Sequence, residues 1–152
     1  MTTDPSHYTS LGLLLRLAHQ QWTLAVDTRL AEEGFDDLKP HHANVFTFVP
    51  PEGIQVSELT TLAHVRKQSM TQTVEELERL GYVERRPDPN DRRGKLVFLT
   101  ERGKKVSPIA RAAGRLVDQH WAELTSREEI EALRRALRSV LAATAPKVED
   151  GN

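Results

Sequence analysis

The segment between Val56 and Gly103 constrains the fold most strongly, because its hydrophobic pattern changes from a helical period to a strand period. Two stretches place apolar residues at steps of three and four, which indicates two amphipathic helices. The apolar positions are Val56, Leu59, Leu62 and Ala63, then Met70, Val74, Leu77 and Leu80. Residues 64–66 separate the helices, and Gly81 ends the second. Residues 82–99 then contain two strand-like runs around a Pro-Asp-Pro-Asn turn, which predicts a β-hairpin.

The rest of the chain is predicted to be helical. A long amphipathic helix is expected over about residues 6–33, closed by Gly34, and a short one over 40–49. Ile54 can add a residue or two of strand, and Ser57 is the expected cap of the next helix. After the hairpin, Thr100 is expected to cap a long helical region, and Ser126 with Glu129 forms a predicted capping box for the last helix. The sequence therefore indicates a mainly α fold with one small hairpin.

The second helix of the pair, which starts near Lys67, is polar over its first half. Two short helices joined by a tight turn, the second with such an N-terminal half, are typical of a helix-turn-helix. Side chains that present donors and acceptors can read base edges, and a basic helix start suits phosphate. The candidate contacts are Lys67, Gln68, Ser69, Thr71 and Gln72. Glu75 and Glu76 are expected where the helix leaves the groove. A helical hairpin with a solvated polar face is the alternative interpretation.

The predicted hairpin is strongly basic. Eight basic and three acidic residues lie between Arg85 and Lys105, although the net charge of the chain is −1. Arginine is weakly hydrated and fork-shaped, so at the tip of a hairpin it suits a narrow DNA minor groove. Arg92 and Arg93 are therefore candidate minor-groove contacts. We expect Asp91 to orient Arg93 through a salt bridge. The residues expected to support backbone contacts are Arg85, Arg86 and Lys95. A basic hairpin without a partner is the alternative.

Composition and motifs exclude several other classes. The chain has no cysteine, which rules out disulfides and thiolate metal sites. The six histidines include one adjacent pair, His41 and His42, and no acidic residue completes a recognisable metal spacing, so we expect neither a metal nor a cofactor. There is no phosphate loop, zinc-protease motif or nucleophile elbow, and we expect no enzyme. Without a signal peptide or long apolar run, a cytoplasmic protein away from the membrane is expected.

Several of these motifs resemble the MarR family of bacterial transcriptional regulators. The similar segments are 59–63, 77–85 and above all 88–103, which reads DPNDRRGKLVFLTERG. The resemblance places Asp91 and Arg93 at the family's wing positions, and Gln68, Ser69, Thr71 and Gln72 at its recognition-helix positions. It implies a winged helix-turn-helix homodimer that binds double-stranded DNA at a pseudo-palindromic operator. Such a protein is usually a repressor and is often released by a small-molecule effector.

The terminal helices agree with this resemblance, since their apolar stripes are suited to pairing across a two-fold axis. The candidate interface residues are Leu14, Leu15, Trp22, Leu133, Leu137 and Leu141; a monomeric bundle is the alternative. We therefore expect one domain, residues 1–152, with dimerisation helices over 1–37 and 104–145 and the DNA-binding unit over 38–103. A family-like effector pocket would be lined by Trp22, His41, Phe46 and His64. A winged-helix module that binds protein instead of DNA is the other functional alternative, and Arg92 and Arg93 argue against it.

Overall fold

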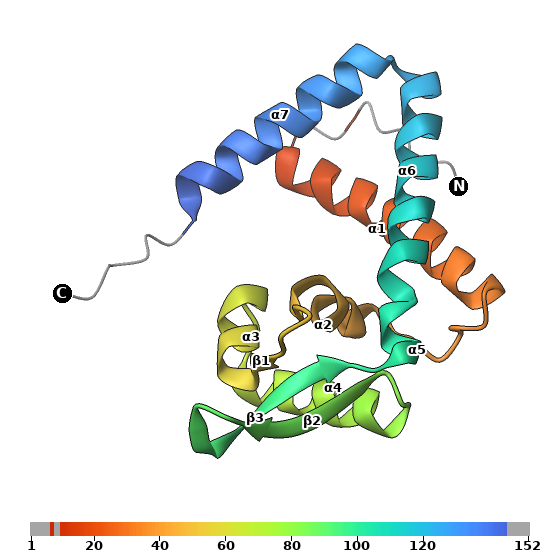
Figure 1. Cartoon of the computed structure of the whole chain (residues 1–152). Helices are drawn as coiled ribbons and strands as arrows, with labels where there is room; N and C mark the ends of the chain where they lie inside the picture. The colour runs from red at the N-terminus through yellow and green to blue at the C-terminus, as the bar shows by residue number, and fades with distance from the viewer. Residues whose placement is uncertain (1–6, 8–9, 146–152) are drawn as a thin grey trace. The chain divides into compact units, whose positions relative to one another are not determined.

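The computed structural model describes residue 7 and residues 10–145, and it is mainly helical with one small sheet, as expected. Residues up to Ala113 form one compact unit, and residues from Gly114 form a second. The elements in chain order, all labelled in Figure 1 except η2, are α1 Leu11–Glu32, η2 Pro40–His42, α2 Ala43–Phe48, β1 Ile54–Gln55, α3 Val56–Ala63, α4 Lys67–Arg79, β2 Val83–Asp88, β3 Asp91–Leu99, α5 Glu101–Lys104, α6 Val106–Leu124 and α7 Arg127–Thr144.

The helix boundaries differ from expectation in three places. Within the described residues α1 begins at Leu11, where the Ser10 hydroxyl accepts a hydrogen bond from the Leu13 amide at 3.4 Å; the expected start near residue 6 lies partly outside the described part. Gln55 and not Ser57 precedes α3, so Ser57 falls inside the first turn. Thr100 caps α5 as expected, but Lys105 interrupts the helical region before α6 begins.

The sheet has three antiparallel strands in the order β1-β3-β2. Ile54 pairs with Val97, and Val83 pairs with Leu99, so β3 lies in the middle. The register shifts between Pro87 and Asp88, next to the turn. Figure 1 shows that this turn projects from the end of the hairpin, away from the helices of the same unit. The hairpin therefore has the form of a wing beside the helix pair.

The helix-turn-helix follows the predicted limits closely. His64 adopts a left-handed conformation with φ of 54°, which ends α3 and starts the tight turn to α4. Gly81, with φ of 81°, lies in the turn between the end of α4 and the start of β2. Met70, Val74 and Leu77 are buried on the inner face of α4, as predicted. The opposite face of α4 is consequently left to solvent.

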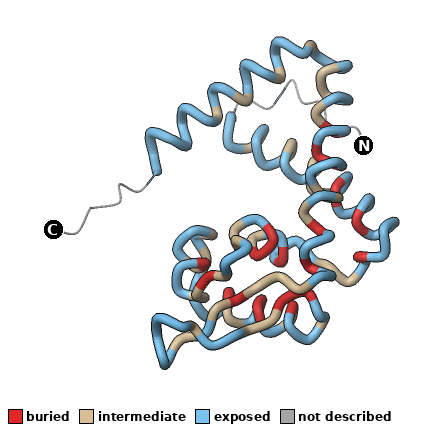
Figure 2. Tube along the Cα trace, in the orientation of Figure 1, coloured by how far each residue is buried: buried red, intermediate tan, exposed pale blue. Residues whose placement is uncertain are grey.

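The core of the first unit joins α1 to the winged-helix elements. Figure 2 shows buried positions on each of the helices and strands around the sheet. Tyr82, fully buried, packs edge-on against Phe46 with ring centroids 5.7 Å apart. The buried aliphatic residues that complete this core include Val26, Leu30, Val45, Leu59, Val83, Val97 and Val106. The C-terminal half of α1 is therefore part of the same core as the helix pair and the wing.

A polar cluster fastens the loop after α1 to the end of α4. The Tyr82 hydroxyl donates to Asp37 Oδ1, while Arg102 Nη2 donates to Asp37 Oδ2 at 3.2 Å. The Arg102 guanidinium also stacks on the Tyr82 ring, 4.2 Å from its centroid. Burial and the hydrogen bond to Asp37 raise the pKa of Tyr82, so its hydroxyl remains a donor. This cluster connects three segments that are distant in the sequence.

In the second unit, α7 is held against the end of α6 by an ion pair. Arg134 Nη2 lies 2.9 Å from Asp118 Oδ2. Ser126 caps α7 by accepting from the Glu129 amide, but Glu129 returns a contact to the Ser126 hydroxyl and not to its amide, so the predicted capping box is only half formed. Leu133 is 43 % exposed and Leu141 68 % exposed.

No helix among the described residues has the length and apolar content needed to cross a membrane.

Candidate nucleic-acid interface

The exposed face of α4 brings most of the predicted base-reading residues together. Lys67, Gln68, Thr71 and Gln72 line one groove on this helix, and Glu75 lines it with them. Ser69 is exposed beside the groove. The residues that line the groove stand at helical spacing, so they lie along one side of the helix. A row of amide, hydroxyl and ammonium groups of this kind can meet base edges and adjacent phosphates.

The tip of the wing presents unpaired basic side chains. Arg92, Arg93 and Lys95 are exposed, and none of them forms an ion pair within the described residues. Asp91 behaves differently from expectation: its Oδ1 accepts from the backbone amide of Arg93 at 3.0 Å, with no contact to the guanidinium. Asp91 therefore shapes the backbone at the tip and leaves the Arg93 side chain available.

A second aspartate completes the shape of the turn. Asp88 Oδ1 accepts from the Asn90 amide at 2.9 Å, and Asp88 Oδ2 accepts from Gln55 Nε2 at 2.8 Å. These two bonds lower the pKa of Asp88, which keeps the carboxylate charged and the turn connected to β1. Nothing in the local sequence predicts this pairing, because Gln55 and Asp88 lie in separate segments.

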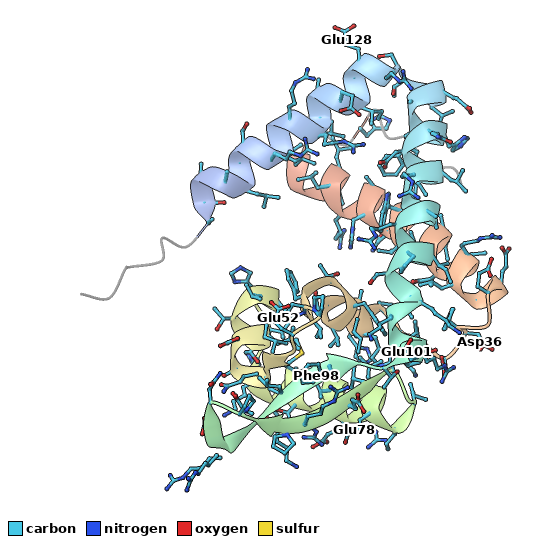
Figure 3. All side chains as sticks on the ribbon, viewed as in Figure 1. Asp36, Glu52, Glu78, Phe98, Glu101 and Glu128 are labelled. Carbon is cyan, nitrogen blue, oxygen red and sulfur yellow. The ribbon has the colours of Figure 1, made fainter. Side chains whose placement is uncertain are left out.

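Two arginines expected to support DNA backbone contacts are engaged within the protein. Arg85 donates two hydrogen bonds to Glu78, from Nε at 3.1 Å and from Nη2 at 3.0 Å. Figure 3 labels Glu78 on α4 beside the hairpin. Arg86 pairs with Glu84 and lies over the Phe98 ring, 4.3 Å from its centroid. The Arg85–Glu78 pair connects the wing to α4, whereas the contacts of Arg86 stay within the wing, so Lys95 is the free member of the predicted supporting set.

Glu76 does not line the groove on α4 and is bonded to two histidines. Its Oε2 lies 2.8 Å from His41 Nε2 and 2.9 Å from His42 Nε2. Hydrogen bonds from His41 and then His42 lower the pKa of Glu76 to about 2, so the carboxylate is charged at neutral pH. Glu76 therefore fastens η2 to α4, and its charge is not presented to the groove.

Although no acidic residue stands at a metal-ligand spacing from the histidine pair in the sequence, the fold brings Glu76 to it, and the three ligand atoms lie within 4.8 Å of one another. The proton position on His42 favours a hydrogen-bonded structural contact over a metal site. His42 Nδ1 accepts from the Lys39 amide at 3.0 Å, so the proton of neutral His42 is on Nε2 and faces Glu76. A metal-bound histidine normally has the reverse arrangement, with its second nitrogen donating. Burial lowers the pKa of His42 and favours this neutral form.

A cavity of about 370 Å³ lies between α1, α2 and the start of α6, all within the first unit. Of the residues expected at an effector pocket, Trp22 and Phe46 line this cavity, whereas His41 and His64 do not. His41 points outward to Glu76, and His64 occupies the α3–α4 turn. His42 lines the cavity in their place. The further lining residues include Val26, Leu30, Leu38, Ala110, Asp27, Lys39 and Arg111.

Comparison with known proteins agrees with this geometry. The MarR family model matches residues 36–94. The transcriptional regulator HosA of Escherichia coli O111:H- is 30 % identical over 129 residues, which cover 85 % of this chain and 93 % of HosA. The reduced form of MarR from Escherichia coli superposes with a TM-score of 0.75 and 26 % identity, over 89 % of this chain and 98 % of MarR.

CouR from Rhodococcus jostii RHA1, solved with bound p-coumaroyl-CoA, has a TM-score of 0.69 and 26 % identity, over 93 % of this chain and 96 % of CouR. Family model, sequence relative and solved structures all indicate the same fold and class of function. The chain therefore belongs to the MarR family of transcriptional regulators, and it is a winged helix-turn-helix protein that binds double-stranded DNA as a homodimer.

Proposed function

We propose that each subunit of the homodimer inserts α4 into the major groove of a pseudo-palindromic operator and places the tip of its wing in the adjacent minor groove. Gln68, Ser69, Thr71 and Gln72 contact base edges, and Lys67 contacts phosphate. Arg92, Arg93 and Lys95 contact the minor groove and its backbone, on a turn shaped by Asp91. The observation that supports this most directly is the row of polar residues along one exposed groove of α4.

In this proposal, one part of the chain binds DNA and the terminal helices form the dimer. Residues 38–103 form the DNA-binding unit, and the helices over 1–37 and 104–145 provide the dimer contacts. Exposed leucines on the terminal helices support this division, since Leu14 and Leu15 are each 39 % exposed and α7 has no buried residue. Two recognition helices related by a two-fold axis would contact half-sites one DNA turn apart, about 34 Å. A dimer seated on a promoter excludes the polymerase, so we propose a repressor in the bacterial cytoplasm, with no chemical reaction of its own.

Selection of bound genomic fragments by the purified protein tests the proposal. We expect enrichment of an inverted repeat with half-sites one helical turn apart. Binding to that repeat should weaken as salt rises, because basic side chains release counterions from DNA. Gln72→Ala should relax discrimination at one base pair in each half-site. If no duplex is enriched, or if a protein partner is captured through the wing while DNA is ignored, the protein-binding module would be the correct interpretation.

The cavity supports a second part of the proposal, which is release by a small-molecule effector. Trp22 and Phe46 offer aromatic surface, while Lys39 and Arg111 offer positive charge at the same cavity. This combination suits an aromatic acid or its thioester, the class to which the CouR ligand belongs. We expect p-coumaroyl-CoA or a free aromatic carboxylate to raise the melting temperature and lower DNA affinity. Ala110→Trp should fill the cavity and abolish both effects while DNA binding remains.

A further inference from the structure

The three glutamates on the second half of α4 are in different environments. Glu76 is bonded to His41 and His42, and Glu78 receives two hydrogen bonds from Arg85. Glu75 forms no ion pair and accepts no side-chain hydrogen bond within the described part of the chain. Glu75 is also exposed. One carboxylate of this helix is therefore without a protein partner.

Glu75 lies on the side of the helix that meets DNA. It lines the same groove as Lys67, Gln68, Thr71 and Gln72. Steps of three or four residues connect Gln68, Thr71 or Gln72, and Glu75 along one side of the helix. Glu75 and Glu76, which the sequence places together where the helix leaves the DNA, therefore differ in their surroundings. Glu76 is bonded to the two histidines and does not line the groove.

An unpaired carboxylate on a DNA-reading surface has two physical consequences. It is repelled by the phosphates of any duplex, so it weakens binding that depends on charge alone. It can also accept a hydrogen bond from an amino group on a base edge, and the N4 amino group of cytosine is the partner that carboxylates recognise in the major groove. The same side chain therefore penalises most sequences and favours those with a correctly placed cytosine.

We propose that Glu75 is a specificity-determining residue that accepts a hydrogen bond from the N4 amino group of a cytosine in each half-site and disfavours other DNA by charge repulsion. This inference rests on the proposed function, since it requires α4 to occupy the major groove. Glutamine at this position would lose the negative charge and could pair with adenine. Alanine would lose both the charge and the base contact.

The test uses the full-length protein and a randomised pool of duplexes to find the preferred half-site. Dissociation constants are then measured for that site, for the site with each base pair replaced, and for an unrelated duplex over a range of salt concentrations. The variants are Glu75→Gln and Glu75→Ala. Glu128→Gln is the matched control, because Glu128 is an exposed glutamate whose replacement removes the same charge from a different helix, in the first turn of α7 (Figure 3).

We expect the wild type to prefer cytosine at one position of each half-site by about 5- to 100-fold. Glu75→Ala should remove this preference, and Glu75→Gln should shift it toward adenine. Both variants should bind the unrelated duplex more tightly and with a steeper salt dependence than the wild type. Glu128→Gln should leave base preference and unrelated-duplex affinity unchanged.

The outcomes separate this inference from the proposed function. If the wild type selects a half-site and Gln72→Ala alters its preference, while both Glu75 variants match the wild type on every duplex, the role of Glu75 is wrong and the proposed function stands. The same conclusion holds if Glu75→Ala keeps the cytosine preference. If the wild type binds no duplex at low salt, both proposals are wrong. Circular dichroism establishes that each variant is folded before binding is compared.

Discussion

The buried imidazole of His42 and the carboxylate of Glu76 meet at 2.9 Å, although the two residues are 34 positions apart in the sequence. His42 is 1 % exposed, and its other ring nitrogen accepts from the Lys39 amide at 3.0 Å. Both polar atoms of the ring are therefore satisfied inside the protein. The contact fastens the segment before α2 to α4, and Glu76 does not line the groove on that helix.

Replacing His42 should be much more costly than replacing His41, although both rings contact the same oxygen of Glu76. His42→Ala leaves a cavity, removes one of the two partners of Glu76 and leaves the Lys39 amide without its acceptor, so we expect a loss of about 2–4 kcal/mol in the free energy of unfolding. The His41 side chain is 49 % exposed, and His41→Ala should cost less than about 1 kcal/mol. Urea denaturation of both variants measures the difference. Equal losses of unfolding free energy would contradict a larger structural role for His42.

The pH dependence of stability should report the Glu76 carboxylate. The two histidines lower the pKa of Glu76 from 4.5 to about 2, so the unfolded chain binds this proton at a higher pH than the folded chain does. The stabilisation is complete above the unfolded pKa and is lost as pH falls from about 4.5 toward 2. Glu76→Gln should be less stable than the wild type at neutral pH, and the difference should shrink across this window. Unfolding at a series of pH values, with Glu128→Gln as control, measures this, and a constant difference would refute it.

Gly103 should not tolerate a side chain. A Cβ at this position would overlap the carbonyl oxygen of Tyr82, which accepts a hydrogen bond from the Thr100 amide at 3.0 Å. We expect Gly103→Ala to lower the free energy of unfolding by about 3 kcal/mol. Gly12 is the matched control, because a Cβ there would meet only Ser10 Oγ at 3.7 Å on the surface of α1. Gly12→Ala should raise stability by about 0.5–1 kcal/mol, and thermal unfolding of both variants distinguishes the two sites.

The wing residues should affect DNA binding through charge and through backbone shape. Arg93→Ala should weaken binding to all sequences and reduce the salt slope by about one counterion for each subunit. Asp91→Ala should also weaken binding, although it removes a negative charge, because the Arg93 amide loses the acceptor that shapes the turn. Fluorescence anisotropy at several salt concentrations measures both effects. Tighter binding by the Asp91 variant would mean that its charge matters more than its hydrogen bond.

Local sequence was sufficient to predict the helix pair, the hairpin and the inner face of α4, although several helix ends differ. The three- and four-residue spacing of Met70, Val74 and Leu77 predicted which side of α4 is buried, and all three residues are buried. Gly81 and the Pro-Asp-Pro-Asn turn predicted the end of that helix and the hairpin. These features depend on neighbours within a few residues, where periodicity and backbone preference act directly. The motif from 88 to 103 was also enough to indicate the family.

The tertiary structure alone decided how the charged and polar groups are used. The sequence placed Glu75 and Glu76 in the same role, but His41 and His42 hydrogen-bond Glu76, whereas Glu75 lines the groove. The sequence predicted that Arg85 supports DNA contacts, but in the structure its guanidinium is hydrogen-bonded to Glu78. Adjacent residues on a helix point about 100° apart, and their partners come from segments that are distant in the chain. The periodicity of a helix is a local property, whereas the partner of each carboxylate depends on which segments the fold brings together.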